Sequence, residues 1–317
     1  MAESTLQAPV RVKEPFMSRF RLTKREWKNL GMGLAFISPW LIGFCVFLVY
    51  PIYYTIRISF TKYTGFGDPK WIGLENYRDM IHDEVFWKAV YNTLYYTLLA
   101  VPIGAVAALV LALLMNQPLP EVKIFRAIVY IPSVIPLFTL SFVFQVLMNP
   151  TQGIFNRFLL FFGLPNINWF GDPRYAKLAL VILAQFGAGQ AAIIFLAALK
   201  GIPTSLQEAA ALDGAGTIRR FFNITIPMLT PVILYDIILG LSLGLQIFTQ
   251  VYILGGDPPG SPAGSTMMYV VYLYVNGFRY GELGFAAAMA WVLFLATVVI
   301  AGIIFGTSKW WVNYDQV

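Results

Sequence analysis

The chain has one cysteine, Cys45, and one histidine, His82, and only 12% of its 317 residues are charged. These two residues cannot supply the usual zinc ligand sets or a clustered catalytic set, so we expect neither a metal centre nor an enzyme. No Gly-x4-Gly-Lys-Ser/Thr sequence occurs, which excludes ATP binding by a P-loop. The net charge of +6 does not indicate nucleic acid binding, because the Lys and Arg residues lie beside apolar segments and form no patch with aromatic residues.

Apolar residues make up 58% of the chain, whereas soluble domains are at most about half apolar and about 25% charged. The apolar runs are long and continuous, and each reaches the roughly 20 residues that a helix needs to cross a bilayer. Pro132 and Pro136 are expected to kink the third run. We therefore predict an all-α integral membrane protein with six transmembrane helices, at 30–56, 88–115, 124–148, 178–199, 229–254 and 284–307.

Charge next to these spans predicts the topology. The segment 1–29 is basic and is expected to be a cytoplasmic tail. It is not a signal peptide, because the apolar run that follows is too long and lacks a cleavage site of small residues. An even number of spans then places both termini in the cytoplasm. The remaining parts are a first span at 30–56, an outer loop at 57–87, a five-span core at 88–308 and a cytoplasmic tail at 309–317.

Uncharged polar residues lie within the fourth and fifth predicted spans. Ser242, Gln246 and Gln250 follow one another at steps of four and are expected to share one helix face. Such a face suits a sugar, which offers many hydroxyl groups, but hydrogen bonds between helices would explain it equally well. Gln190 lies next to glycines that leave room for a ligand or a close helix.

Asp236 is the one clear case of an ionisable side chain at depth within a span. Such residues are costly in a membrane and are functional candidates by default. A proton relay would need further ionisable groups at depth, and the sequence has no such chain. We therefore expect a carboxylate near the cytoplasmic end of the fifth span, paired with Arg219, Arg220 or another subunit.

Two pairs of glycines are spaced for close helix packing. Gly240 and Gly244 lie in the fifth span, and Gly302 and Gly306 in the sixth. Small residues at this spacing let helices approach closely in lipid, either within the chain or against a second membrane subunit.

The polar stretch between spans four and five predicts two short helices on the cytoplasmic face. Ser205 and Glu208 have the spacing of a capping box, so Ser205 is expected to begin the first helix. Gly214 permits a turn. Thr217 is expected to cap the second helix, and Pro227 to end it before the fifth span. The small side chains of the first helix suit insertion into a groove of a partner, although an unpartnered surface helix has the same pattern.

This stretch carries a resemblance to a known family. Glu208-Ala209-Ala210, three residues, Gly214, nine residues, Ile224, one residue and Ile226-Pro227 match the motif E-A-A-x3-G-x9-I-x-L-P, with Ile226 in place of Leu. The motif is typical of the membrane subunits of binding-protein-dependent ABC importers. The sequence around it resembles the sugar-permease branch of the maltose-transporter type, as do Ser38-Pro39-Trp40, Ile72-Gly73-Leu74-Glu75-Asn76-Tyr77, Gly255-Gly256-Asp257-Pro258, Ser265-Thr266 and Phe285-Ala286-Ala287-Ala288.

The resemblance implies a type I ABC importer permease fold with a coupling helix at 203–220. The residues expected to contact a cytoplasmic ATPase subunit are Glu208, Ala209, Ala210, Asp213 and Gly214. In this family the spans before and after the motif line the translocation path. The residues expected there are Gly187, Gln190, Ser242, Leu245 and Gln246.

The partners implied are a second homologous permease in a heterodimer, two ATPase subunits that hold ATP and Mg, and an extracytoplasmic solute-binding protein. The chain itself would hold no cofactor and would lie in a prokaryotic inner membrane. The expected substrate is a di- or oligosaccharide, with glycerol phosphate or a polyol as the alternative. A secondary carrier is the other alternative, but the sequence shows neither paired ionisable residues at depth nor inverted repeats. The chain lacks the extra spans and the large inserted outer domain of the maltose prototype.

Overall fold

The computed structural model describes residues 23–256 and 258–314, so residues 1–22 of the predicted basic tail lie outside the described part, as do 315–317 of the C-terminal tail. The chain divides into two compact units, which meet between Thr55 and Ile56. The first unit holds α1 (Lys24–Phe44), the π-helical segment Cys45–Val49 and the start of α2 (Tyr50–Ser59). Thr23 caps α1, because its side-chain oxygen accepts from the Glu26 N–H and the Glu26 carboxylate accepts from the Thr23 N–H. The last residues of the predicted tail are therefore helical.

The second unit begins with the predicted outer loop, which is folded. Strand β1 (Thr61–Lys62) pairs antiparallel with β2 (Lys70–Trp71), and α3 (Glu75–His82) follows. The buried Asn76 side chain donates to the Ser59 and Thr61 carbonyls, at 2.8 and 3.0 Å, and so ties α3 to the hairpin. This two-stranded hairpin is a small addition to the predicted all-α fold.

Hydrophobic helices of spanning length form the rest of the architecture. The described residues include four continuous helices that are long and apolar enough to cross a membrane. Two further pairs of helices, each bent at a short break, can each form one more span, which gives up to six, in agreement with the six predicted. The continuous ones are Lys24–Ser59, Glu84–Met115 (α4), Thr217–Leu245 and Leu283–Ser308 (α15). The bent pairs are Val122–Val134 (α5) with Leu137–Leu147 (α6), at 102°, and Pro173–Gln185 (α8) with Ala188–Gly201 (α9), at 45°.

The bend between α5 and α6 has its cause in Pro136. A residue before proline is driven out of the helical region, and Ile135 accordingly has φ −69° and ψ 128°. Pro136 is itself extended, with ψ 137°. Pro132 remains inside α5. The predicted kink of the third span is therefore present, but it lies at Pro136 alone.

The fifth span differs most from its prediction. Helix α11 (Thr217–Arg220) continues through a π-helical segment, Phe221–Thr225, into α12 (Ile226–Leu245), so one helix runs from the coupling region into the membrane. Pro227 does not stop it. It comes just after the π-helical segment, and a local π-helical turn of this kind lets a membrane helix tolerate a proline. The span also ends at Leu245 rather than 254, and α13 (Thr249–Leu254) is a separate short helix.

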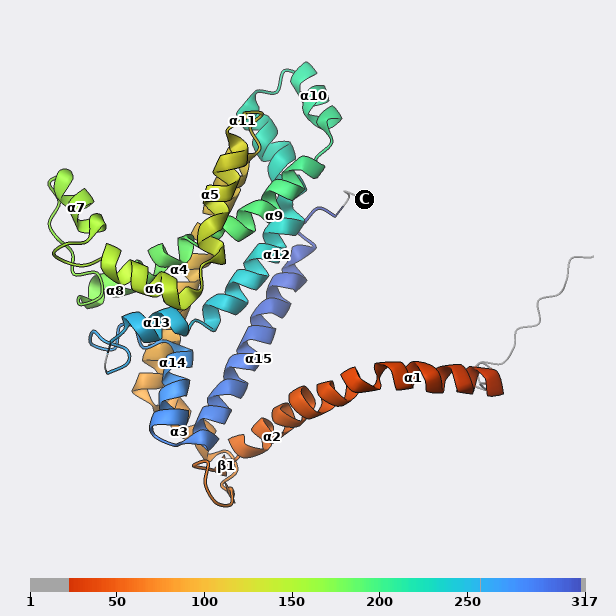
Figure 1. Ribbon diagram of the computed structural model, residues 1–317, viewed down its shortest axis with the longest axis vertical. Helices are drawn as coiled ribbons and strands as arrows, with labels where there is room; N and C mark the ends of the chain where they lie inside the picture. Colours follow the sequence, from red (N-terminus) through yellow and green to blue (C-terminus); the bar gives the residue numbers. More distant parts are fainter. Residues whose placement is uncertain (1–22, 257, 315–317) are drawn as a thin grey trace, which may run out of the picture. The chain divides into compact units, whose positions relative to one another are not determined.

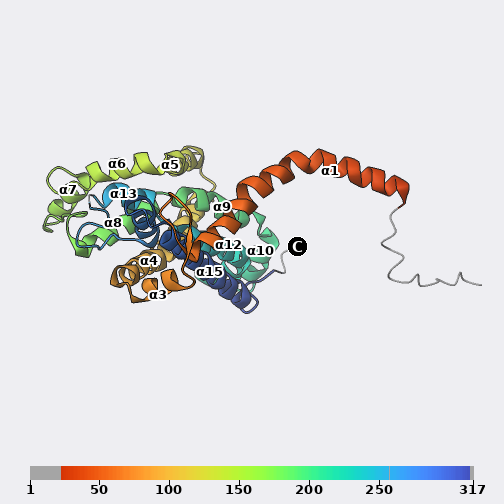
Figure 2. The ribbon, with the colours of Figure 1, turned by 90° about the horizontal axis from the view of Figure 1, so that it is seen from below.

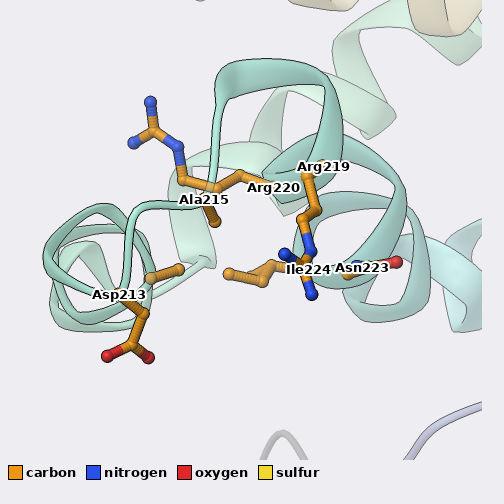
Figure 3. Close-up of a pocket in the computed structure, with 7 residues that line it drawn as sticks. Asp213, Ala215, Arg219, Arg220, Asn223 and Ile224 are labelled. Carbon is orange, nitrogen blue, oxygen red and sulfur yellow. The ribbon is translucent and has the colours of Figure 1, made fainter.

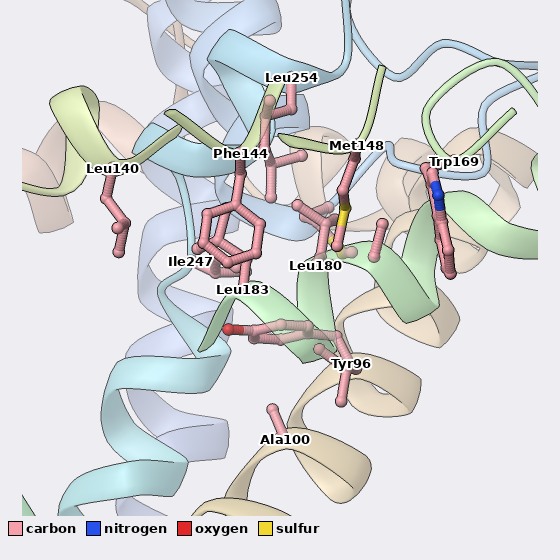
Figure 4. Packing of buried hydrophobic residues seen from close by; sticks show 14 of the residues in the cluster. Tyr96, Ala100, Leu140, Phe144, Met148, Trp169, Leu180, Leu183, Ile247 and Leu254 are labelled. Atoms are coloured by element: carbon pink, nitrogen blue, oxygen red, sulfur yellow. The ribbon is translucent and has the colours of Figure 1, made fainter. Parts of the chain in front are cut away.

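The remaining short helices are α7 (Ile154–Phe161), α14 (Tyr269–Tyr274) with its π-helical extension Val275–Arg279, and α10 (Thr204–Leu212). Helix α10 lies at the end of the second unit opposite to α14 (Figure 1). Helices α5, α6 and α7 lie along one side of this unit, with α9, α13 and α8 beside them (Figure 2). Phe144 of α6 is fully buried in the largest cluster of apolar residues, above Leu180 and Leu183 of α8 and Tyr96 of α4 (Figure 4).

Asn92 joins three elements near the N-terminal end of α4. Its side chain is 2% exposed and donates to the carbonyls of Gly264 and Met267, at 2.9 and 3.0 Å. Its carbonyl oxygen accepts from the Lys177 ammonium group of α8, at 3.1 Å. The loop 258–268 and α8 are therefore fixed to α4 through one side chain.

Candidate functional site

The coupling stretch is helical as predicted, but it begins differently. Helix α10 starts at Thr204 with Pro203 as its N-cap, and no side chain caps it. The predicted Ser205–Glu208 capping box is therefore wrong. Pro203 has ψ 129° and lies outside the helix, so Ser205 already lies within the first turn and cannot take the cap position. Thr217 is likewise the first helical residue of α11, after Gly216 as N-cap, and does not cap it.

The end of α10 agrees with the prediction. Gly214 has φ +78°, which is the left-handed conformation that favours glycine. The Gly214 N–H donates to the Ala211 carbonyl at 3.1 Å, and the Ala215 N–H to the Ala210 carbonyl at 2.9 Å. These two bonds form a Schellman motif, which satisfies carbonyls at the end of the helix. The turn therefore depends on Gly214.

The exposed surface of this region is apolar at its tip. Leu212 is 90% exposed, and Ile218 just beyond the turn is 76% exposed. Glu208 and Ala209 are also exposed, whereas Ala210 is half-buried. Sequence reasoning missed Leu212, although a large apolar residue in a polar helix directly before a turn is a usable signal for a docking contact.

Hydrogen bonds attach α10 to the long helix Thr217–Leu245. The Gln207 amide donates to the Thr225 hydroxyl at 3.2 Å, and the Arg220 guanidinium donates to the Gln207 carbonyl at 3.4 Å. Gln207 is therefore bonded across the Gly214 turn to two residues of the long helix. A displacement of α10 would be passed to the long helix through these contacts.

A cavity of about 230 Å³ lies between α10 and the start of the long helix. Figure 3 shows the Arg219 guanidinium beside Ile224 and Asn223, while the Asp213 carboxylate points away from it. Ala210 also lines this cavity, so a bulky substitution there would disturb the fold as well as a partner. Four of the five residues predicted to contact an ATPase are exposed, namely Glu208, Ala209, Asp213 and Gly214.

A larger cavity, of about 710 Å³, lies among α4, the two bent pairs and α12. Three of the residues predicted for a substrate path line it: Gly187 and Gln190 near the α8–α9 bend, and Gln246 just after α12. Gln250 lines it as well. The structure thus brings together polar groups from the spans before and after the coupling stretch.

Two predicted path residues do not line this cavity. The Ser242 hydroxyl donates to the Ile238 carbonyl at 2.9 Å, and Leu245 is buried, 5% exposed. The expected common face fails because α12 ends at Leu245, so Gln246 and Gln250 are no longer on the same helix as Ser242. The side of α12 that faces the cavity carries Tyr235, Asp236, Leu239, Gly240, Leu243 and Gly244.

Asp236 is not the helix-end carboxylate that the sequence suggested. It is the eleventh of the 20 residues of α12 and lines the cavity. Within residues 23–256 and 258–314, neither Arg219 nor Arg220 forms an ion pair with it. The predicted pairing within the chain is therefore wrong, because these arginines lie at the far start of the same long helix.

Two buried polar atoms of the cavity wall have no hydrogen-bond partner. These are Oε1 of Gln185 and Oγ of Ser133. Such atoms are costly to leave unpaired, which makes them candidates for contact with an enclosed water molecule. In the part of the chain that the structure describes, no group of three His, Cys, Asp or Glu residues could hold a metal ion.

The glycines predicted to allow close approach fall into two groups. A Cβ on Gly189 would lie 2.2 Å from the Val129 carbonyl oxygen of α5, and one on Gly244 would lie 2.8 Å from Thr97 of α4. Gly189 therefore serves a close helix rather than a ligand. Gly302 and Gly306 have nothing within 4 Å, so they do not pack against the described chain.

Replacing Gly189 with Ala is expected to lower the free energy of unfolding by about 1–3 kcal/mol, because the new methyl group would push α5 away from α9. Denaturant or thermal unfolding of the detergent-solubilised protein measures this. The matched control is Gly302→Ala, which meets no neighbour and should not destabilise the protein. Equal stability of the two variants would show that α5 can move aside without cost.

Comparison with known proteins shows relatives over almost the whole chain. A family profile described as "Binding-protein-dependent transport system inner membrane component" matches residues 83–308. A probable ABC transporter permease protein, YesP of Bacillus subtilis (strain 168), is 38% identical over 95% of this chain and 96% of the relative. The lactose transport system permease protein LacF of Rhizobium radiobacter is 35% identical over 87% of this chain and 94% of that protein.

The fold also has a counterpart among solved structures. A chain of a bacterial ABC transporter involved in the import of the acidic polysaccharide alginate superposes with a TM-score of 0.77. The alignment covers 90% of this chain and 99% of that chain, at 24% sequence identity. At this identity the likeness concerns the fold alone.

Proposed function

The chain belongs to the binding-protein-dependent transport system inner membrane components, and from this premise we propose that it carries a sugar into the cell as one permease subunit of an ABC importer. A di- or oligosaccharide is the substrate class that the lactose permease relative supports. The observation that carries the proposal is the continuous helix Thr217–Leu245. It starts at the family's coupling motif and ends on a cavity wall that presents glutamine side chains.

The proposed mechanism follows the contacts of α10. A cytoplasmic ATPase subunit binds the exposed side of α10, at Glu208, Ala209 and Leu212, together with the turn at Gly214. Closure of two such subunits on ATP and Mg, which they hold and this chain does not, displaces α10. The Gln207–Thr225 and Arg220–Gln207 bonds pass this displacement to the long helix, whose far half lines the cavity. The cavity then opens alternately to the two sides of the membrane.

The remaining partners are placed by the same scheme. α10 and both termini face the cytoplasm of a prokaryotic cell, and an extracytoplasmic solute-binding protein delivers the sugar to the opposite end. A second, homologous permease completes the path as a heterodimer. Gly302 and Gly306 of α15 are open on their outer side and are available for close packing with another membrane helix.

Uptake by the reconstituted complex tests this proposal. Proteoliposomes with both permeases, the ATPase and the binding protein should take up a labelled oligosaccharide when ATP is present. Uptake of glycerol phosphate or a polyol instead would select the alternative solute class. A stable and active homo-oligomer of this chain without an ATPase would contradict the proposal and favour a secondary carrier.

Replacing both Gln190 and Gln246 with Leu is expected to reduce uptake about tenfold, since each lost hydrogen bond to a sugar hydroxyl is worth about 0.5–1.5 kcal/mol. Initial uptake rates in proteoliposomes measure the effect, and co-purification with the other subunits should be unchanged. Gln117→Leu, an exposed residue outside the cavity, is the control. Undiminished uptake by the double variant would make the two glutamines packing residues.

A further inference from the structure

The larger cavity carries negative charge and no positive charge in its described wall, which would disfavour an anionic solute. Asp236 is the only charged residue in the described wall, and no Lys, Arg or His among residues 23–256 and 258–314 lines it. Asp236 is half-buried and has no ion-pair partner in that part of the chain. The wall that this chain contributes is therefore negative.

The polar groups of the wall also offer acceptors. The ionised Asp236 carboxylate only accepts. The Gln190, Gln246 and Gln250 side chains in the same wall each carry an amide oxygen. The Gln246 amide N–H already donates to the Ser242 carbonyl at 3.0 Å. Acceptors of this kind are matched by sugar hydroxyl groups, which donate hydrogen bonds. A phosphate, sulfonate or uronate group only accepts, so it would face unmatched acceptors and a like charge.

We propose that Asp236 is a specificity determinant of this cavity, which accepts neutral, hydroxyl-rich sugars and rejects anionic solutes. The inference rests on the proposed function, because it assigns a substrate class to the same path. Asp236 acts directly on the solute, by accepting hydroxyl hydrogen bonds and by repelling negative charge.

The test compares solutes on the purified complex without the binding protein, so that the selectivity of the binding protein does not enter. Equilibrium dialysis of the complex in nanodiscs would measure the affinity for a glucose disaccharide, for its uronic acid analogue and for glycerol 3-phosphate. The quantity compared is the ratio of the affinity for the neutral disaccharide to that for each anionic solute. The wild type should favour the neutral disaccharide by on the order of 10- to 100-fold. Asp236→Asn keeps the shape and an acceptor but removes the charge, so it should bring this ratio close to one. The control Asp79→Asn, exposed on α3 and outside the cavity, should leave the ratio unchanged.

The outcomes separate this inference from the proposed function. An unchanged ratio in Asp236→Asn overturns the inference alone. Loss of the second permease on purification of that variant also overturns it, because Asp236 would then pair with a cation across the subunit interface. A wild-type complex that binds none of the three solutes and imports no sugar overturns the proposed function as well.

Discussion

Replacing Leu212 with Asp is expected to abolish ATP-driven uptake while the chain still folds and inserts. Leu212 is 90% exposed in this structure, so the substitution removes no internal contact. In the assembled importer its side chain would be buried against the ATPase, where a leucine contributes about 1.5–3 kcal/mol. An unpaired carboxylate at the same place would add a desolvation cost. Together these predict a loss of ATPase affinity of at least about 100-fold.

Co-purification of the ATPase with the tagged permease measures this loss, alongside uptake by proteoliposomes. Leu212→Met is the conservative control, because it keeps an apolar side chain of similar size, and it should retain most of the activity. Normal ATPase binding by Leu212→Asp would place the docking surface elsewhere.

Glu208→Lys is a second probe of the same surface. It tests docking without disturbing the helix start, because no side chain caps α10.

Replacing Asn92 with Ala is expected to give the largest loss of stability, about 3 kcal/mol or more. The variant removes three hydrogen bonds of the buried Asn92 side chain at once, to the Gly264 carbonyl, the Met267 carbonyl and the Lys177 ammonium group. The bond to Lys177 involves a charged group and is therefore worth more than a neutral one. Unfolding of the solubilised protein by heat or denaturant measures the change.

The control for this prediction is Asn116→Ala, at the exposed C-terminal end of α4, which should change stability by no more than about 0.5 kcal/mol. Asn92→Ala should also loosen the loop 258–268, which hydrogen exchange would report as faster exchange of its amides. If exchange in this loop and overall stability both stay unchanged, Asn92 does not hold the junction.

Hydropathy and one motif predicted most of this fold, because lipid demands long apolar helices and the coupling stretch interrupts them with polar residues. The errors have local causes. The fifth span was placed too late, because hydropathy does not register the polar helical turns between Thr217 and Pro227. The Ser205 cap failed because Pro203 fixes an earlier helix start. Ser242, Gln246 and Gln250 were expected on one helix face, which fails because the helix ends at Leu245.

The candidate site was predicted less completely than the fold. Gly187, Gln190 and Gln246 line the cavity as expected, since each is a polar or small residue beside a break in an apolar helix. Leu212 was missed although an apolar residue directly before a turn is a usable signal. The cavity position of Asp236 needed the structure, because it depends on where the long helix begins, which is not a property of local sequence.

The π-helical segment Phe221–Thr225 sets an angular relation along the long helix. Each residue of an α-helix turns the side chain direction by about 100°, so the number of residues between Arg220 and Asp236 fixes which way Asp236 faces. The π-helical segment has more residues per turn than an α-helix, so each of its residues rotates the side chain direction by less than 100°. The length of this segment is thus itself under constraint, and gaining or losing one residue there would rotate the cavity wall away from the solute even if every side chain were kept.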